Sequence, residues 1–293
     1  MEYTNRQLLH EGQERLKAAG ITEADADAWI LFAGTTGLDR TAYLMRGSES
    51  VKEDTVEKYF EKIRRRMDRE PVQYIEGTAP FMGYDFAVNE NVLIPRMDTE
   101  ILVSEALKEA DRMCRERLHG TDVRVLDMCT GSGCIIESLY LLLEKNGYEI
   151  KAEASDVSEK ALETAKLNAE RLGAEIKFNK GNLFESVNGT FNMILSNPPY
   201  IRSSVIEELE PEVREHEPRL ALDGTDDGLY FYREITGKAG EYLEDGGILM
   251  FEIGYDQGME VSRLCMQNGY SDVRVIKDFA GLDRVVSAVY TKH

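Results

Sequence analysis

The residues with the clearest capacity for chemistry are Asn197-Pro198-Pro199-Tyr200, which follow the apolar, strand-like run 191–196. Each proline keeps the preceding residue extended and lacks an N–H group. This stiff strand end presents the Asn197 amide, neighbouring backbone carbonyls and the Tyr200 ring. It suits a planar group with an NH2, whose hydrogens the carbonyls accept while the ring packs on its face. The alternative is a structural Pro-Pro turn in which Asn197 bonds locally.

A glycine loop, Cys129-Thr130-Gly131-Ser132-Gly133, follows a second predicted strand and leads into the apolar helix 135–143. A strand, loop and helix in this order open a doubly wound fold, in which ligands lie beyond the carboxyl ends of the strands. A dinucleotide-binding loop requires a third small residue at position 136, where this chain has Ile136, and no Gly-Lys-Ser/Thr of a Walker loop follows. The loop therefore indicates another cofactor.

Two aspartates end consecutive predicted strands: Asp127 precedes the glycine loop, and Asp156 ends the next strand. A carboxylate at Asp127 repels a pyrophosphate but suits a ligand with an ammonium and a sulfonium. Asp156 is placed to accept hydrogen bonds from both hydroxyls of a ribose. After the following strand, Asn182 and Leu183 are placed to line an adenine. Either aspartate alone is equally well explained as a helix cap, but together these features favour S-adenosylmethionine.

The remaining pattern predicts an α/β protein with a helical appendage. Residues 1–75 have the apolar spacing of a small helical domain, and residues 76–98 have the glycine and aromatic pattern of a β-hairpin connector. In residues 99–293 strands alternate with helices, which predicts a parallel sheet with helices on both faces. The predicted strands are 123–127, 152–156, 175–179, 191–196, 247–253, 272–276 and 284–290.

The composition narrows the cellular setting and the partners. Of the net charge of −19, a share of −17 falls on residues 71–293, which opposes a general affinity for nucleic acid. No run approaches the ~20 apolar residues of a membrane span, and the N-terminus lacks a signal-peptide pattern. The four cysteines form no CxxC pair and the four histidines are scattered, so we expect neither a metal site nor disulfides. These features predict a cytoplasmic protein, which we expect to be a monomer.

The Asn-Pro-Pro-Tyr motif after the fourth strand resembles that of class I S-adenosylmethionine-dependent methyltransferases that act on planar NH2 groups. Val92-Leu93-Ile94-Pro95-Arg96-Met97-Asp98-Thr99-Glu100 is similar to a signature of one branch, the protein-(glutamine-N5) methyltransferases of peptide chain release factors. The same branch is similar at residues 73–77, 217–222, 227–229 and 277–284. The resemblance therefore covers nearly the whole chain.

This resemblance implies a Rossmann-like fold with a mostly parallel seven-stranded sheet, and a helical domain that recognises the substrate. The implied reaction moves a methyl group from S-adenosylmethionine to N5 of the glutamine in the Gly-Gly-Gln motif of class 1 release factors, without direct contact to nucleic acid. Asn197, Pro198 and Tyr200 would be catalytic, and with Pro199 they would bind the glutamine. The cofactor-binding residues would be Asp127, Cys129, Thr130, Gly131, Ser132, Gly133, Asp156, Asn182, Leu183 and Asn197.

The chain departs from this family at three positions. Met97 stands where the family usually has proline, Cys129 where its loop has a first glycine, and Asn182 where an aspartate is more usual. Glycine tolerates torsions that cysteine rarely adopts, and we expect the loop to accommodate Cys129. None of the three changes removes a group that the chemistry requires.

Three other functions remain open from the sequence. A methyltransferase of adenine N6 or guanine N2 in nucleic acid shares the motif, but the acidic charge of residues 71–293 opposes it. An enzyme that methylates a glutamine of a ribosomal protein also shares the motif and differs in the Ile-Pro-Arg segment. A non-catalytic subunit that binds S-adenosylmethionine would have little use for the motif and the glycine loop together.

Overall fold

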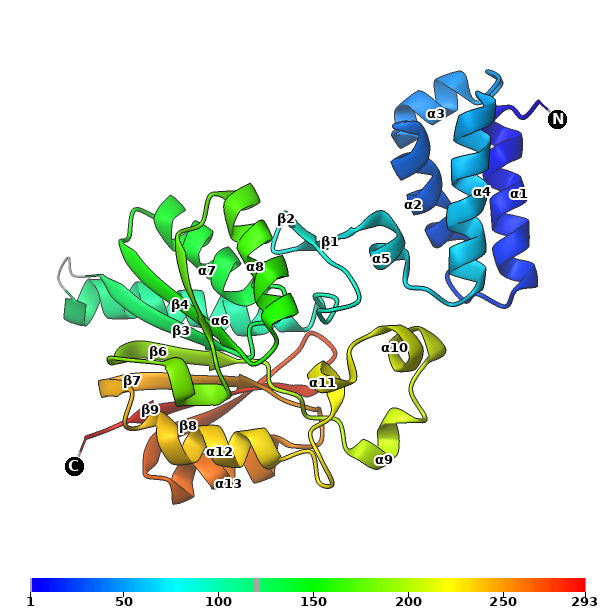
Figure 1. The fold of residues 1–293 in the computed structure, drawn as a ribbon. Coiled ribbons are helices and arrows are strands. Elements are labelled where there is room, and N and C mark those ends of the chain that lie inside the picture. Colours follow the sequence, from blue (N-terminus) through cyan, green and yellow to red (C-terminus); the bar gives the residue numbers. More distant parts are fainter. Residues whose placement is uncertain (1, 119–121, 293) are drawn as a thin grey trace. The chain divides into compact units, whose positions relative to one another are not determined.

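The computed structural model describes residues 2–118 and 122–292 (Figure 1). The chain forms two compact units. The first consists of the residues up to Thr78 together with Glu210–His216, and the second consists of Ala79–Leu209 and the residues from Glu217 onward. The chain therefore leaves the second unit for a short segment, adds that segment to the first unit, and returns.

The first unit is a helical bundle, as the sequence predicted. Its core is formed by large side chains that are at most 1% exposed, among them Leu8, Phe32 and Tyr59. Gly12 lets the Tyr59 ring approach, because a Cβ at position 12 would lie 2.0 Å from the Tyr59 hydroxyl oxygen. The helices of residues up to 78 are α1 (Asn5–Ala18), α2 (Ala24–Thr36), α3 (Arg40–Arg46), α4 (Glu53–Met67) and α5 (Val72–Glu76).

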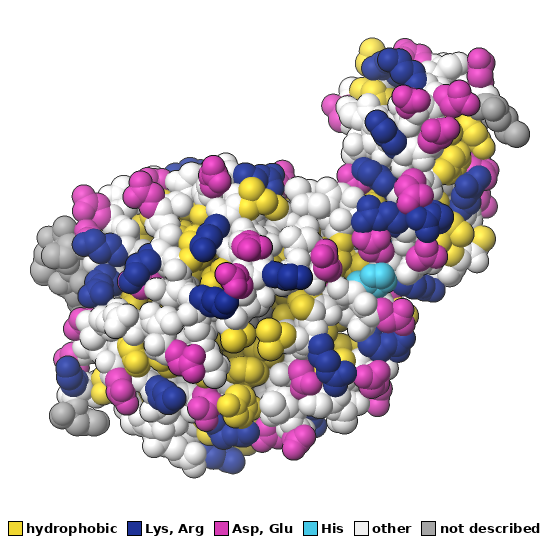
Figure 2. Space-filling model, viewed as in Figure 1, with side chains coloured by type: hydrophobic (Ala, Val, Ile, Leu, Met, Phe, Trp, Pro, Cys, Tyr) yellow, Lys and Arg dark blue, Asp and Glu magenta, His cyan; other side chains and the backbone are white. Residues whose placement is uncertain are grey.

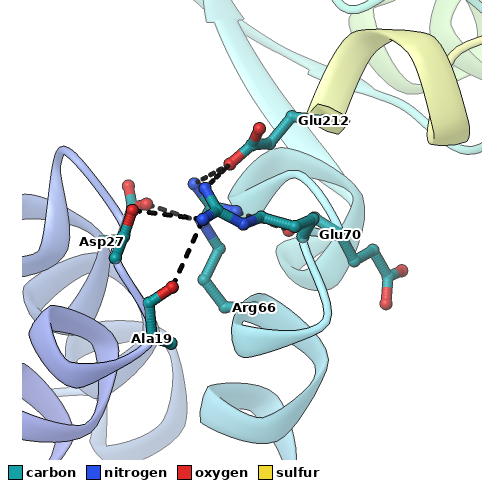
Figure 3. A network of polar contacts seen from close by, with 7 residues as sticks. Ala19, Asp27, Arg66, Glu70 and Glu212 are labelled. Atoms are coloured by element: carbon teal, nitrogen blue, oxygen red, sulfur yellow. Dashed lines mark hydrogen bonds and ion pairs between the residues drawn. The ribbon is translucent and has the colours of Figure 1, made fainter. Parts of the chain in front are cut away.

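Ion pairs attach the second piece of this unit, which contains helix α10 (Pro211–His216). Arg66 of α4 lies between two carboxylates (Figure 3): its Nε is 2.7 Å from Asp27 Oδ2, and its Nη2 is 3.0 Å from Glu212 Oε1. The side chains of Arg66 and Asp27 are only 8% and 9% exposed. The segment that contains Glu212 is thus held by a buried ionic network of the helical unit.

The second unit contains a seven-stranded sheet in the order β5-β4-β3-β6-β7-β9-β8, which confirms the mostly parallel sheet predicted from the sequence. Strands β3 to β7 run parallel, and β9 is antiparallel to both of its neighbours. The strands are β3 (Val123–Met128), β4 (Ile150–Asp156), β5 (Ile176–Lys180), β6 (Phe191–Ser196), β7 (Leu243–Glu252), β8 (Tyr270–Lys277) and β9 (Asp283–Tyr290).

Helices cover both faces of this sheet (Figure 1). Alternate residues of β3 enter different cores: Val125 packs with α6 and α7, and Leu126 packs with α12 and α13. Burial on both faces explains why the strands are nearly continuous apolar runs. The longer helices are α6 (Thr99–Met113), α7 (Cys134–Lys145), α8 (Glu159–Leu172), α12 (Tyr230–Ala239) and α13 (Gly258–Gln267).

Short elements complete the chain. The predicted hairpin is present as β1 (Thr78–Phe81) and β2 (Tyr84–Ala87), which pair in a separate small sheet. The remaining turns of helix are η1 (Cys114–Leu118), η2 (Leu183–Ser186), α9 (Ser203–Ile206) and α11 (Arg219–Leu222). Across the described ranges, we find no helix long and apolar enough to cross a membrane.

Candidate active site

The strand order reverses between β3 and β6, and this pair of strands brings the two predicted motifs together. Met128 pairs with Ser196 at the carboxyl ends of these strands. The glycine loop leaves β3 from this edge, and Asn197 follows β6 beside it. In open α/β sheets, a reversal of this kind opens a crevice that binds ligands.

A cavity of about 420 Å³ lies at this edge of the sheet. Loops from four neighbouring strands, β3 to β6, contribute to its wall. Of the residues that the sequence assigned to the site, those lining the cavity are Cys129, Thr130, Gly131, Ser132, Asp156, Asn182, Leu183, Asn197 and Pro199. The structure thus brings most of the predicted site residues together around one space.

Asp127, Gly133, Pro198 and Tyr200 do not line this cavity. Asp127 is fully buried, and the Thr130 hydroxyl donates to its Oδ2 at 2.5 Å. Its Oδ1 has no hydrogen-bond partner among the described residues. Burial raises the pKa of Asp127 to about 7. Direct contact of these four residues with a ligand remains a prediction.

The glycine loop has a left-handed backbone at several positions. Gly131 has φ of 56° and Gly133 has φ of 83°, and Cys129 has φ of 61°. Cys129 therefore adopts a conformation that favours glycine, while its side chain packs against the buried cluster shared with α12 and α13. At Gly133 space is also limited, because a Cβ there would lie 2.1 Å from Glu137 Oε1.

Asp156, the last residue of β4, connects the glycine loop to the cavity. Its Oδ2 accepts from the Gly131 N–H at 3.0 Å, and its Oδ1 accepts from the Ser158 N–H at 2.8 Å. Burial raises the pKa of Asp156, and these N–H groups oppose the shift. Each carboxylate oxygen accepts one of these bonds and so keeps capacity for another from a ligand.

Asn182 and Leu183 follow β5 at another part of the cavity wall. Asn182 directly precedes η2: its backbone carbonyl accepts from the Glu185 N–H at 3.2 Å, and the Glu185 carboxylate accepts from the Asn182 N–H at 3.0 Å. The Leu183 carbonyl accepts from the Ser155 hydroxyl at 3.1 Å. These bonds hold the backbone of both residues at the cavity wall.

The Asn-Pro-Pro-Tyr segment is held at both ends by side chains from other elements. The Asn197 Nδ2 donates to Thr99 Oγ1 of α6 at 3.3 Å. The Tyr200 hydroxyl donates to Glu252 Oε1 of β7 at 3.2 Å. Gly228 allows close packing on this backbone, because a Cβ there would lie 2.4 Å from the Tyr200 carbonyl oxygen.

Comparison with known proteins decides the family. Residues 7–77 match the family model described as the PrmC N-terminal domain, and residues 99–211 match the methyltransferase small domain. The release factor glutamine methyltransferase of Agrobacterium fabrum is 40% identical over 284 residues, which is 95% of each chain. That of Geobacter sulfurreducens is 39% identical, covering 97% of this chain and 96% of the relative. The chain belongs to the release factor glutamine methyltransferase family.

The fold of this family member is also found in a distant solved structure. The crystal structure of the hMettl16 catalytic domain in complex with the MAT2A 3′UTR hairpin 6 superposes with a TM-score of 0.53. It shares 15% sequence identity and covers 82% of this chain and 83% of that one. This likeness shows the class I methyltransferase fold predicted from the sequence.

A release factor glutamine methyltransferase takes its methyl group from S-adenosylmethionine, and the cavity residues fit this cofactor. Asp156 has acceptor capacity for ribose hydroxyls, and Asn182 and Leu183 would hold the adenine. Gly131 would lie closest to the ribose end, because its N–H is bonded to the same Asp156 carboxylate. The cofactor-binding role of each of these residues remains a prediction.

Some residues in or beside the cavity of this methyltransferase were not assigned to the site from the sequence. Thr99 is 3% exposed and lines the cavity, as does Arg96, which pairs with the buried Glu217 at 2.5 Å. Glu252 is 1% exposed and bonds to Tyr200. A signal for Glu252 was present, because an acidic residue ends a buried strand. Only the pairing of β7 with β6 shows that this strand end lies beside Asn197.

Proposed function

We propose that this protein transfers a methyl group from S-adenosylmethionine to the side-chain amide nitrogen, N5, of the glutamine in the Gly-Gly-Gln motif of class 1 release factors. One observation carries the proposal: the glycine loop after β3 and two residues that follow β6, Asn197 and Pro199, line the same cavity. This arrangement supports a cofactor site beside a site for a planar NH2 group.

The chemical task of the site is to hold a poor nucleophile in place. An amide nitrogen is weakly nucleophilic because its lone pair is delocalised into the carbonyl group. When bound, S-adenosylmethionine supplies a methyl group activated by its sulfonium. The protein must therefore contribute orientation and charge stabilisation.

Asn197 and Pro198 provide the acceptors for this orientation. The Asn197 Nδ2 is engaged with Thr99, so its Oδ1 accepts one hydrogen of the glutamine NH2. The Pro198 carbonyl accepts the other hydrogen. Both oxygens carry partial negative charge and stabilise the positive charge that develops on nitrogen. A proton leaves readily from a cationic nitrogen, so no strong general base is required.

Apolar residues of the cavity wall keep water from the reacting groups. Pro199, Leu220, Ala221, Tyr230 and Phe231 line the same space as Asn197. An apolar wall of this kind suits a glutamine with glycine neighbours, because glycines have no side chains to obstruct an extended loop. We also assign Tyr200 a role, in which its ring packs on the flat face of the glutamine amide.

The helical domain, residues 1–75, would recognise the folded release factor. Residues 76–98 would connect it to residues 99–293, which would perform the transfer. We infer that the substrate is a protein and that nucleic acid makes no direct contact. The charge of −17 on residues 71–293 supports this inference. On the face of the helical unit seen in Figure 2, acidic and basic side chains are interspersed. We place the protein in the cytoplasm as a monomer.

The test is incubation with labelled S-adenosylmethionine and a purified class 1 release factor, followed by peptide mass mapping. A matched substrate with asparagine in place of the motif glutamine serves as the control. We expect one methyl group on the Gly-Gly-Gln peptide and none on the control. Methylation of a ribosomal protein or of a nucleic-acid base, with an unmodified release factor, would overturn the proposal.

A further inference from the structure

We propose that two buried side-chain amides are positioning residues for the two halves of the site: Gln257 clamps the end of the Asn-Pro-Pro-Tyr segment, and Asn168 clamps the glycine loop. Their roles in methyl transfer rest on the function proposed above. The clamps themselves are properties of the free enzyme and can be measured without substrate.

Gln257 lies directly before α13 and is 5% exposed. Its Nε2 donates to two backbone carbonyls, that of Tyr200 at 3.1 Å and that of Gly228 at 3.2 Å. Its Oε1 accepts from the Gly254 N–H at 3.0 Å. One side-chain amide therefore ties the last residue of the motif to Gly228 and to the loop after β7.

Asn168 of α8 has the same pattern of bonds on the glycine loop. Its side chain is fully buried. Its Nδ2 donates to the carbonyls of Ser132 and Ala87, both at 3.0 Å, and its Oδ1 accepts from the Ala87 N–H at 2.7 Å. Ser132 lines the cavity and Ala87 ends β2. Asn168 therefore ties the glycine loop to the small hairpin.

The orientation of both amides is determined by their partners. Every partner is a backbone group, so its character as donor or acceptor is fixed. A flipped amide would place its oxygen against two carbonyl oxygens and its NH2 against an N–H group. Loss of either amide would leave buried backbone groups unsatisfied, which is costly in the interior of a protein.

The Asn-Pro-Pro-Tyr segment is a stiff piece of chain whose ends decide its position. Its two prolines have fixed φ angles, so few torsions remain free between β6 and Tyr200. Strand β6 holds the first end, and the bond from Gln257 holds the backbone of Tyr200 at the other end. Gln257 does not line the cavity, so it acts through this segment and not on the substrate.

The second partner of Gln257 also leads into the cavity wall. Gly228 is followed closely by Tyr230 and Phe231, which line the cavity together with Asn197 and Pro199. By bonding to Tyr200 and Gly228, Gln257 joins two segments that both continue into this wall. We infer that it sets the position of the proposed amide acceptors relative to the apolar residues around them.

Gln257→Glu and Asn168→Asp are matched variants that should differ in their effects. Each keeps the shape and the acceptor for the N–H group, and each replaces the NH2 by an oxygen that faces two carbonyls. At about pH 8 we expect Gln257→Glu to lower kcat on a release factor by about 100-fold, the scale of a small misplacement of a reacting group. Its Kd for S-adenosylmethionine, measured by calorimetric titration, should be unchanged.

Asn168→Asp should act on the cofactor instead. Its Kd for S-adenosylmethionine should rise by about 10-fold, the scale of one lost hydrogen bond. Gln257→Met, which keeps the length of the side chain without its polar groups, repeats the comparison of kcat and Kd if Gln257→Glu fails to fold. A general loosening of the fold would change kcat and Kd together in every variant and would overturn the division of roles.

The pH dependence of Gln257→Glu provides a readout that a merely structural role would not give. A neutral carboxyl donates to one of the two carbonyls, whereas a carboxylate only accepts. The kcat relative to wild type should therefore fall as pH rises through the pKa of the new carboxyl, and that of Gln257→Met should be low at every pH. Tyr232, whose hydroxyl is 3.4 Å from Gln257 Oε1, and Arg202 favour ionisation. The acidic residues that line the same hollow oppose it: Asp226, Asp227, Asp256 and Glu260.

Hydrogen exchange of the two side-chain NH2 groups tests the clamps in the free enzyme. Their resonances are assigned by their absence in Gln257→Glu and Asn168→Asp, and exchange should be slow in the wild type. Fast exchange of the Gln257 group, or a wild-type kcat in Gln257→Glu, would overturn the role of Gln257. An unchanged Kd in Asn168→Asp would overturn that of Asn168. Slow exchange in a wild-type enzyme that leaves the release factor unmethylated would instead overturn the proposed function.

Discussion

Asp156 illustrates, at the scale of the residue, how one side chain can serve the fold and a ligand together. Its two oxygens accept the N–H groups of Gly131 and Ser158. It therefore shapes the glycine loop from within the cavity wall. The acceptor capacity that remains on each oxygen is what a ribose would use.

Asp156→Ala should weaken binding of S-adenosylmethionine. Hydrogen bonds to a charged group contribute about 1.5–3 kcal/mol, so the Kd should rise by roughly 10-fold to 150-fold in calorimetric titration. Asp227→Ala is the control, because Asp227 is exposed, pairs with Arg233 at 2.7 Å and does not line the cavity. An unchanged Kd for the Asp156 variant would show that the cofactor lies elsewhere.

Asp127 should make stability depend on pH in an unusual direction. Its pKa is raised to about 7 in the fold, against about 3.9 in an unfolded chain. The folded state retains a proton that the unfolded state releases, so the free energy of unfolding falls as pH rises from about 4 to 7.

Asp127→Asn should remove this loss, because asparagine stays neutral and keeps an oxygen for the Thr130 hydroxyl. The measurement is the free energy of unfolding of both proteins by chemical denaturation. The value for the variant minus that for the wild type should increase by about 2–3 kcal/mol between about pH 5 and pH 8. A difference that is the same at both pH values would contradict the assigned pKa.

The elements of the second unit were largely predictable, because each carries a local pattern. The strand runs, the glycine loop and the Asn-Pro-Pro-Tyr segment identified the sheet and nine of the residues that line the cavity. For Glu252 the sequence showed only an acidic residue at the end of a buried strand, and its place beside Asn197 depends on the pairing of β7 with β6. The sequence marked Cys129 as a replacement for a glycine, and the structure shows that it adopts the left-handed backbone that cysteine seldom has.

Two glycines of the loop should respond differently to alanine. Gly131 and Gly133 both have positive φ, and a left-handed residue with a Cβ costs about 1–2 kcal/mol. At Gly131 a Cβ would meet no atom within 4 Å, whereas at Gly133 it would lie 2.1 Å from Glu137 Oε1 and 3.2 Å from Ala165 Cβ. Gly133→Ala should therefore lower the melting temperature more than Gly131→Ala; the reverse order would show that the loop is packed differently.

At the scale of the whole molecule, the chain passes between the two units at the connector after residue 75 and again on either side of segment 210–216. The segment 210–216 belongs to the helical unit, which the continuous boundaries predicted from the sequence did not include. Its neighbours in the chain, Pro218 and Leu220, line the cavity. No sequence pattern indicates this arrangement, because it depends on an ion pair between Arg66 and Glu212, which are far apart in the chain.

Arg66→Ala should destabilise the helical unit, because it leaves the buried Asp27 without its cation. Removing one partner of a buried ion pair costs about 3–5 kcal/mol. Glu212→Ala is the matched comparison: Arg66 keeps Asp27, so the loss should be much smaller. Thermal unfolding of the full chain measures the stability of both variants. Equal losses of stability would show that the ion pair with Asp27 does not contribute more than the pair with Glu212.

The central claim is that the Asn197 oxygen holds the amide nitrogen of a release-factor glutamine for methylation. The most direct test is turnover by Asn197→Ala on a purified release factor, with the methylated position mapped by mass spectrometry. Loss of one preorganised polar contact of this kind lowers kcat by about 100-fold to 1,000-fold, and we predict a loss in this range at the Gly-Gly-Gln glutamine. The account would be contradicted if Asn197→Ala kept the wild-type rate. It would also be contradicted if the wild-type enzyme methylated a group other than this glutamine.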